Sequence, residues 1–265
     1  MLPRVNVIKC NEADYLLFTT DDLISKILYK SGQWEESLLV ITRVFLRGVD
    51  KPLILDIGAN LGAYSIPIAK DIQNIGGKVI GFEPQRIVYY QLCGNVILNR
   101  LDNYVALNKA VGDYDGEIEI PEINYEKNDN IGAFSLDKKY REHQNIEQYM
   151  LNQKSLVPII TLDSIDLEQS PVILKIDVEG FELNVLKGGQ KFLEKHNFPP
   201  ILFEAWDFKW FEEGKRELLD FLKYLGYEIS LNIRRAEFVA QHPKNIRHVK
   251  FNWSENGIIN MVRER

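Results

Sequence analysis

The chain has 265 residues, which is enough for one large α/β domain or two smaller ones. Hydrophobic residues make up 45% of it and charged residues 26%, a globular balance that argues against a disordered or collagen-like chain. A formal net charge of −6 argues against general nucleic-acid binding. No apolar run approaches the ~18 residues of a membrane span, there is no leader-like N-terminus, and the two cysteines lack partner spacing, so the sequence predicts a cytoplasmic protein without a membrane span.

Residues 1–50 are predicted to form an N-terminal helical cap or lid, with a strand at 15–19 and helices at about 22–30 and 35–46. Residues 51–265 are expected to form the main domain. Here short apolar runs alternate with helical patterns, which is typical of βαβ units in a parallel sheet. The strands predicted for this sheet are 53–57, 78–82, 104–108, 172–176 and 201–203, and the helices predicted between and after them are 61–75, 85–99 and 215–225.

Two regions depart from this alternation. Residues 121–156 are polar and rich in Asn, and they are too long for an ordinary loop, so they are expected to be a substrate-binding insertion or a partly mobile one. Near the C-terminus, strands at 227–231 and 257–262 are expected to pair antiparallel. The connection 232–256 would then return over the face of the sheet that binds ligands.

A glycine-containing turn follows the first predicted strand directly. It holds Asp56, Gly58, Asn60 and Gly62 and leads into a helix, an arrangement that lets a ligand approach the backbone closely. Glu83 ends the next strand, at the position from which a carboxylate can accept both hydroxyls of a ribose. These features predict a nucleoside cofactor.

The turn departs from the glycine pattern of dinucleotide-binding proteins, because Asn60 and Ala63 stand where that pattern has its second and third glycines. A carboxylate at Asp56 would repel a phosphate, but it can hold the cationic amino-acid end of S-adenosylmethionine. S-adenosylmethionine is therefore the expected cofactor rather than a nicotinamide dinucleotide.

Several motifs resemble those of FkbM-type methyltransferases, over roughly residues 24–206. They are GQWE at 32–35, DIGANLGAYSIPIA at 56–69, FEP at 82–84, KAVGDYDGEI at 109–118, TLDSI at 161–165 and KIDVEGFELNVLKGG at 175–189. The resemblance implies an S-adenosylmethionine-dependent enzyme that methylates hydroxyl groups, mostly on sugars or polyketide-type natural products. It also implies a Rossmann-like class I methyltransferase fold, with a mostly parallel seven-stranded sheet, an antiparallel C-terminal strand and helices on both faces.

With this fold in view, the expected cofactor-binding residues lie in the turn, at the strand ends and in the matching motifs. They are Asp56, Gly58, Asn60, Gly62, Tyr64, Ser65, Glu83, Pro84, Asn108, Ala110 and Asp177.

Acidic residues follow two neighbouring strands, and we expect Asp177, Glu179 and Glu204 to face one cleft. In one interpretation Asp177 is a general base that accepts the proton of an acceptor hydroxyl. In a second, the acids hold a divalent cation that lowers the pKa of that hydroxyl. A purely structural interpretation has Glu179 capping the next helix and Glu182 on the exposed face of that helix.

The connection 232–256 holds five Lys and Arg residues in an otherwise acidic chain, which predicts an acceptor with an anionic group. His242 lies there too and is a further candidate for the base. The acceptor, a small molecule or a glycan, is expected to contact Glu35, Ser135, Trp206, Arg234 and Arg235. The sequence leaves a homo-oligomer open.

Three other functions compete with sugar O-methylation. An RNA ribose methyltransferase would use this fold with a Lys/Asp/Glu site, but Lys175 lies inside a predicted strand rather than at its end. A nicotinamide-dependent sugar dehydrogenase or epimerase would need the second and third glycines of the dinucleotide pattern, which this chain lacks. A binding module that retains the cofactor without catalysis is the third.

Overall fold

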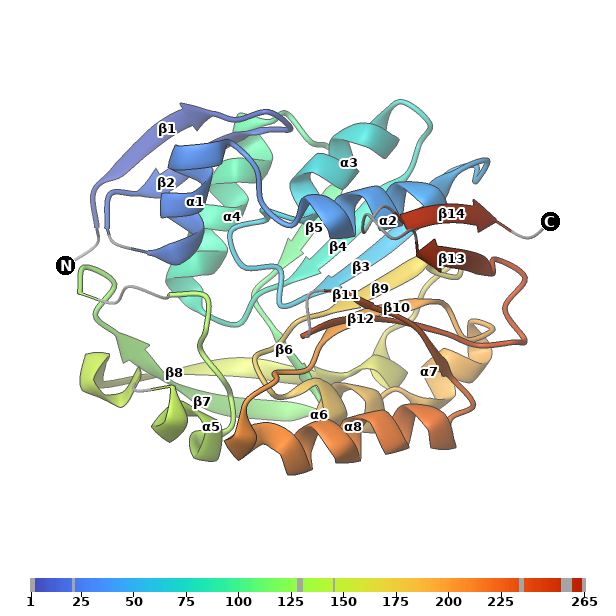
Figure 1. The fold of residues 1–265 in the computed structure, drawn as a ribbon. Helices are drawn as coiled ribbons and strands as arrows, with labels where there is room; N and C mark the ends of the chain where they lie inside the picture. Colours follow the sequence, from blue (N-terminus) through green and yellow to red (C-terminus); the bar gives the residue numbers. More distant parts are fainter. Residues whose placement is uncertain are drawn as a thin grey trace.

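Figure 1 shows the protein as a computed structural model, which describes residues 3–20, 22–127, 131–144, 146–233, 236–253 and 259–263. Its centre is a seven-stranded sheet in the order β11-β12-β10-β9-β3-β4-β5. The strands from β10 to β5 run parallel, and β12 is antiparallel to both of its neighbours. In sheet order the strands are β11 (Glu228–Ile233), β12 (Glu237–Gln241), β10 (Ile201–Glu204), β9 (Ile173–Ile176), β3 (Leu53–Ile57), β4 (Lys78–Phe82) and β5 (Tyr104–Leu107).

Helices cover both faces of this sheet (Figure 1). One face carries α2 (Glu36–Leu46), α3 (Ser65–Gln73) and α4 (Arg86–Leu98), and the other carries α6 (Glu182–Lys187), α7 (Gln190–Lys195) and α8 (Glu212–Tyr224). The central strands are apolar because both faces are covered, and every residue of β3 is buried. The predicted fold class is confirmed.

The pairing predicted at the C-terminus is wrong. Strand β11 pairs with β12, which follows it after a short connection, and not with the last strand of the chain. That last strand, β14 (Ile259–Arg263), instead pairs with β13 (Val249–Trp253) in a separate two-stranded sheet. Strand β12 is close to β11 in sequence, so the two form a hairpin at little cost in loop-closure entropy. β12 therefore pairs with β11 in place of residues 257–262.

The N-terminal region contains the predicted β2 (Asp14–Phe18) and α1 (Leu23–Ser31), and also β1 (Val5–Lys9), which the sequence analysis missed. Asp22 caps α1 by accepting a hydrogen bond from the Ser25 amide. Strand β2 is fixed to α4, since the Asn95 and Asn99 side chains bond its backbone.

The polar stretch 121–156 is largely regular structure rather than a long loop. Strands β6 (Ala110–Gly112), β7 (Gly116–Ile123) and β8 (Met150–Thr161) form a three-stranded sheet in the order β6-β8-β7. Between β7 and β8 lie α5 (Lys138–His143) and the 3-10 turn η1 (Ile146–Tyr149). Two further 3-10 turns are η2 (Leu162–Ser164) and η3 (Lys209–Phe211). In the part of the chain that the structure describes, no helix is long and apolar enough to cross a bilayer.

Candidate functional site

A cavity of about 890 Å³ lies at the carboxyl ends of β3, β4, β9 and β10. In an open α/β sheet this edge is where ligands bind, because the strand order reverses there. We call two parts of its lining the Glu83 side and the Asp177 side. The Glu83 side comprises Gly58, Asn60, Glu83, Pro84 and Ala110, and the Asp177 side comprises Asp177, Glu179, Glu204, Trp206 and Trp210.

The turn after β3 brings the two sides together at Gly58. This residue has φ +85°, and a Cβ atom there would overlap the carbonyl oxygen of Asp177, so only glycine fits. The Asp177 amide also donates a hydrogen bond to the carbonyl oxygen of Ile57 at 2.9 Å. The end of β9 and the turn are therefore in direct backbone contact.

Glu83 is buried on its side of the cavity, with 4% of its surface exposed. Its two carboxylate oxygens accept hydrogen bonds from the amides of Asn60 at 2.9 Å and Gln85 at 2.8 Å. Burial raises the pKa of Glu83 to about 7 against the opposing effect of these bonds. Asn108 supports the same segment, because its side-chain amide donates to the carbonyl oxygens of Glu83 and Pro84.

A buried lysine links the turn to the Asp177 side. The Lys175 ammonium lies 2.9 Å from Asp177 Oδ2 and 3.8 Å from Asp56 Oδ1, and Lys175 is only 5% exposed. Burial alone would lower the pKa of Lys175, but the charges of Asp177, Glu35 and Asp56 raise it well above its usual value. Lys175 therefore carries a positive charge beneath the cavity.

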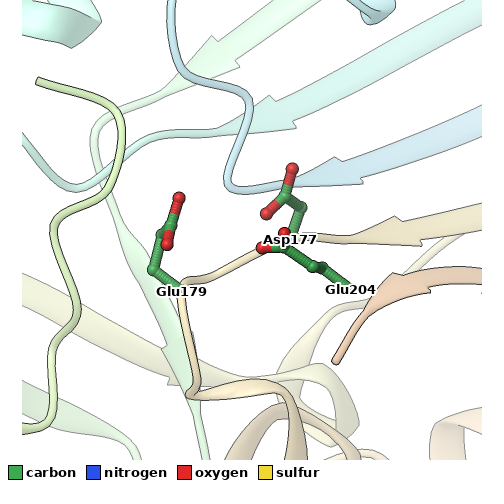
Figure 2. A group of neighbouring side chains, drawn as sticks. All are labelled: Asp177, Glu179 and Glu204. Atoms are coloured by element: carbon green, nitrogen blue, oxygen red, sulfur yellow. The ribbon is translucent and has the colours of Figure 1, made fainter. Parts of the chain in front are cut away.

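Figure 2 shows Asp177, Glu179 and Glu204 gathered at the ends of β9 and β10. One carboxylate oxygen from each lies within 4.8 Å of the others. Their hydrogen-bond partners include two neutral donors, the Gln144 amide at 3.4 Å from Glu179 and the Trp206 indole at 3.0 Å from Glu204. Burial and the neighbouring carboxylates raise the pKa values of Glu179 and Glu204 well above the usual range.

The purely structural interpretation of this loop assigned the roles of Glu179 and Glu182 the wrong way round. Glu182 is not on an exposed face but 1% exposed, and its Oε1 atom accepts hydrogen bonds from the amides of Val178 and Gly180. Glu179 adopts φ +56° and lines the cavity instead. Glu182 holds the loop, and this leaves Glu179 available to a ligand.

Aromatic rings form a wall beside the carboxylates. Trp206, Phe208, Trp210 and His143 line the cavity, and the rings of Phe208 and His143 both stack on Trp210, at centroid distances of 5.2 and 4.8 Å. Tyr140 from α5 packs edge-on against Trp206. The polar stretch thus contributes to the wall through α5.

The same stretch also closes over the turn after β3. The Ile131 amide donates to Asp22 Oδ1, and its carbonyl oxygen accepts from the Gln85 side chain. A Cβ atom at Gly132 would overlap the Asn60 side-chain nitrogen, so the backbone of Gly132 lies directly against the Asn60 side chain. Together with Leu23 and Ile24 of α1, this segment covers the Glu83 side of the cavity.

The structure places most of the predicted site residues on the cavity wall. Those are Glu35, Gly58, Asn60, Tyr64, Glu83, Pro84, Ala110, Asp177, Glu179, Glu204 and Trp206. Arg234 and Arg235 lie outside the described residues.

Besides His242, five predicted residues are not on the wall. Asp56 is fully buried and faces Lys175, Ser65 bonds Tyr104, and a side chain at Gly62 would meet Ile66 and Leu92. Asn108 supports Glu83 from outside the cavity, and Ser135 is buried, with its hydroxyl accepting from the Asp137 amide. Asp56, Ser65 and Asn108 were identified by motif or strand-end position, but their side chains point away from the cavity.

The structure also contradicts the prediction that His242 is a base at the cavity, and it places the basic connection near Lys244 away from the cavity. His242 follows β12 at the edge where β10 begins, because Ala240 pairs with Ile201. Its ring stacks on Phe198 at 4.0 Å. Asn245 bonds the carbonyl oxygens of Asn197 and Phe198, so the connection near Lys244 lies at the amino ends of the parallel strands.

Sequence reasoning missed two cavity residues that matter. Lys175 was set aside because it lies inside a strand, yet its long side chain reaches Asp177 and the cavity wall. Gln144 lies in a polar segment without a recognisable motif. A lysine in an otherwise fully apolar strand was the one signal that could have revealed Lys175.

The Glu83 side fits S-adenosylmethionine on the geometry of this chain. Each Glu83 oxygen accepts one amide and retains a further lone pair for a ribose hydroxyl. The glycine at position 58 leaves room for close approach, and no second or third glycine makes space for a pyrophosphate.

Comparison with known families decides the assignment. The Methyltransferase FkbM domain matches residues 56–229, about two thirds of the chain. The chain belongs to the FkbM methyltransferase family. This methyltransferase family takes the place of the nicotinamide-dependent alternative.

Solved structures similar to this FkbM domain include methyltransferase FkbM from Methylobacillus flagellatus KT, at 20% identity and TM-score 0.48. That match covers 74% of this chain but 45% of the other, so this chain spans less than half of that relative's length. An S-adenosylmethionine-dependent O-methyltransferase from Thermotoga maritima matches at 13% identity and TM-score 0.46, over 97% of this chain and 71% of that one. TYW2 from M. jannaschii, solved in complex with AdoMet, matches at 14% identity and TM-score 0.40, over 91% and 85%. The search of curated proteins returned no match.

Proposed function

We propose that this FkbM-family protein transfers a methyl group from S-adenosylmethionine to a hydroxyl oxygen of a sugar, a glycan or a related natural product. The observation that carries the proposal is the position of Asp177. Asp177 contacts the Gly58 turn through its backbone and lines the same cavity as Glu179 and Glu204. A hydroxyl nucleophile needs a base at this junction, because its own pKa lies far above 7.

The Glu83 side is the proposed cofactor site. Glu83 would accept the ribose hydroxyls, Pro84 and Ala110 would flank the base, and Gly58, Asn60 and Tyr64 would line the amino-acid end. Asp56 acts through Lys175 rather than by direct contact. When bound, S-adenosylmethionine supplies a methyl group on a positively charged sulfur, an electrophile that needs no covalent catalysis from the protein.

Asp177 is the proposed general base. Its Oδ2 atom is held by the Lys175 ammonium, which leaves Oδ1 for the acceptor. As the oxygen–methyl bond forms and the sulfur–methyl bond breaks, Asp177 accepts the hydroxyl proton. Trp206 and the other aromatic rings of the wall offer flat surfaces on which a sugar ring can stack.

A divalent cation is a second way in which the carboxylates could act. Asp177, Glu179 and Glu204 supply the oxygen ligands that Mg²⁺ prefers, at mutual distances that one ion can bridge. In that version the cation would lower the pKa of the hydroxyl. Loss of activity with a chelator and recovery with Mg²⁺ would select it.

Residues 1–50 and the stretch 121–156 are proposed to cover the bound cofactor, since both contribute residues to the cavity wall. Arg234 and Arg235 as acceptor contacts, self-association and cytoplasmic localisation stay predictions of the sequence.

The proposal is tested by incubating the protein with methyl-labelled S-adenosylmethionine and a panel of sugars, nucleotide sugars and glycans, followed by mass spectrometry. We expect label on an oxygen of at least one of these acceptors. Calorimetry in parallel should show binding of the methyl donor and none of NAD. Binding of NAD with no affinity for S-adenosylmethionine would overturn the proposal.

A further inference from the structure

We propose that the acceptor carries an ammonium group close to the hydroxyl that is methylated, and that Glu179, Glu204 and the aromatic wall bind it. This inference rests on the proposed function and names the acceptor class of that same site. Its basis is the charge and chemistry of the cavity wall on the Asp177 side.

The described lining residues are strongly acidic. Asp207 on this wall is already paired with Lys215 at 3.1 Å. Five further carboxylates, from Glu35, Glu83, Asp177, Glu179 and Glu204, face two lysines, Lys109 and Lys175, a formal excess of three negative charges. S-adenosylmethionine brings only a single net positive charge. An uncompensated carboxylate in a cavity is costly, so a further cation is needed for most of these groups to be ionised.

The lysine nearest the carboxylate cluster is already engaged. Lys175 bonds Asp177 and lies near Asp56, and within the described part of the chain no lysine or arginine lies within ion-pair distance of Glu179 or Glu204. The Oε2 atom of Glu35, which also lines the cavity, is buried without a hydrogen-bond partner among the described residues. The wall therefore offers a ligand a buried carboxyl oxygen of Glu35 that no described group hydrogen-bonds, beside two carboxylates without a cationic partner.

Aromatic faces decide which cation fits. Trp206, Phe208 and Trp210 line the cavity next to Glu204, and an ammonium group gains from an aromatic face as well as from a carboxylate. Mg²⁺ keeps several water ligands, and indole rings offer no oxygen to hold them. An ammonium can use the carboxylates and the rings together, so the wall fits an amine better than a metal ion.

The structure weakens the prediction that the acceptor carries an anionic group. The described basic residues Lys244 and Arg247 belong to the connection at the amino ends of the parallel strands, away from this wall. A carboxylate or phosphate brought to Glu179 and Glu204 would be repelled.

The test uses three sugars of one shape, D-glucosamine, D-glucose and D-glucuronic acid, bound to the full chain in the presence of S-adenosylhomocysteine. Calorimetry should give D-glucosamine a dissociation constant about tenfold to a hundredfold lower than that of D-glucose, with D-glucuronic acid weaker than both. Repeating the titration in buffers of different ionisation enthalpy should show protons released, because a bound cation favours the ionised carboxylates.

Substitutions show which side chains cause the preference for glucosamine. Glu179→Gln with Glu204→Gln should remove the preference for glucosamine and leave cofactor affinity unchanged. Glu168→Gln, an exposed carboxylate away from the cavity wall, serves as the matched control and should retain the preference.

Four results would overturn the inference: equal binding of the three sugars, no binding of any of them, preference for glucuronic acid that depends on Arg234 and Arg235, or loss of the glucosamine preference when Mg²⁺ alone is added. Cofactor binding is measured on the same samples. If S-adenosylmethionine fails to bind, the proposed function falls; if it binds and the amine preference is absent, only this inference falls.

Discussion

The two sides of the cavity are built on different principles. On the Glu83 side, the carboxylate at the end of β4 is held by two backbone amides, from Gln85 and from Asn60 in the turn after the neighbouring strand β3, so its position follows from the backbone. On the Asp177 side, three carboxylates, a buried lysine and aromatic rings meet through their side chains. The first arrangement suits a ligand that is the same across a family, and the second suits a ligand that differs from one member to another.

The sharpest way to separate the two sides is Asp177→Asn, which keeps the shape and removes the base. We expect kcat to fall about 10²–10⁴-fold while the dissociation constant for S-adenosylmethionine stays nearly unchanged. Single-turnover kinetics and calorimetry on the same protein measure both quantities. A variant with nearly full kcat would show that Asp177 is not the base.

Lys175→Met tests whether the lysine is what allows carboxylates to lie so close together. It leaves Asp56 fully buried and without its cation, so the free energy of unfolding should fall by about 3–5 kcal/mol. Urea denaturation measures this change. Lys187→Met, at an exposed position on α6, is the control and should change stability by no more than about 0.5 kcal/mol.

Glu83→Ala probes the other side of the cavity. Loss of charge-assisted hydrogen bonds should weaken binding of S-adenosylmethionine by about 1.5–3 kcal/mol and leave any preference among acceptors intact. Glu83→Gln, which retains one acceptor oxygen, should fall between Ala and the natural residue in calorimetry. An acceptor preference altered by either substitution would mean that the two sides are not independent.

Glu35→Gln gives the smallest effect and tests the electrostatic cost of the Asp177 side. Burial raises the pKa of Glu35 from 4.5 to about 7, so the folded protein holds a proton that the unfolded chain releases. Stability from this group is full below pH 4.5 and is lost as the pH rises to about 7. The variant has no such loss. At pH 8 it should be more stable by about 1–2 kcal/mol, less than the ~3 kcal/mol of a fully buried group because solvent reaches the half-buried Glu35 side chain. A difference that did not change between pH 4.5 and 8 would contradict this.

The contrast between the two sides also explains what the sequence could predict. Strands β3, β4, β5, β9 and β10 and the residues Gly58 and Glu83 were predictable, because apolar runs, turn residues and strand ends are local signals. Ser65 was predicted on the cavity but its hydroxyl bonds Tyr104 in the interior, because motif spacing does not say which way a side chain points.

Long-range pairing was the harder problem. The partner of β11 depends on a choice between β12 and the chain end, and the wrong choice moved His242 and the basic connection to the wrong edge of the sheet. The contribution of Gln144 depends on how α5 docks, which no pattern within residues 121–156 encodes.

The bonds between β2 and α4 bear on how the chain acquires its shape during synthesis. The Asp14 amide bonds the side chain of Asn99, 85 residues later, and the Leu16 amide bonds Asn95, 79 residues later. The N-terminal strands cannot dock until that helix has left the ribosome, and contacts over such separations form slowly. The cavity draws on residues from Leu23 to Glu237, so nearly the whole chain must be made before a ligand can bind and stabilise the fold.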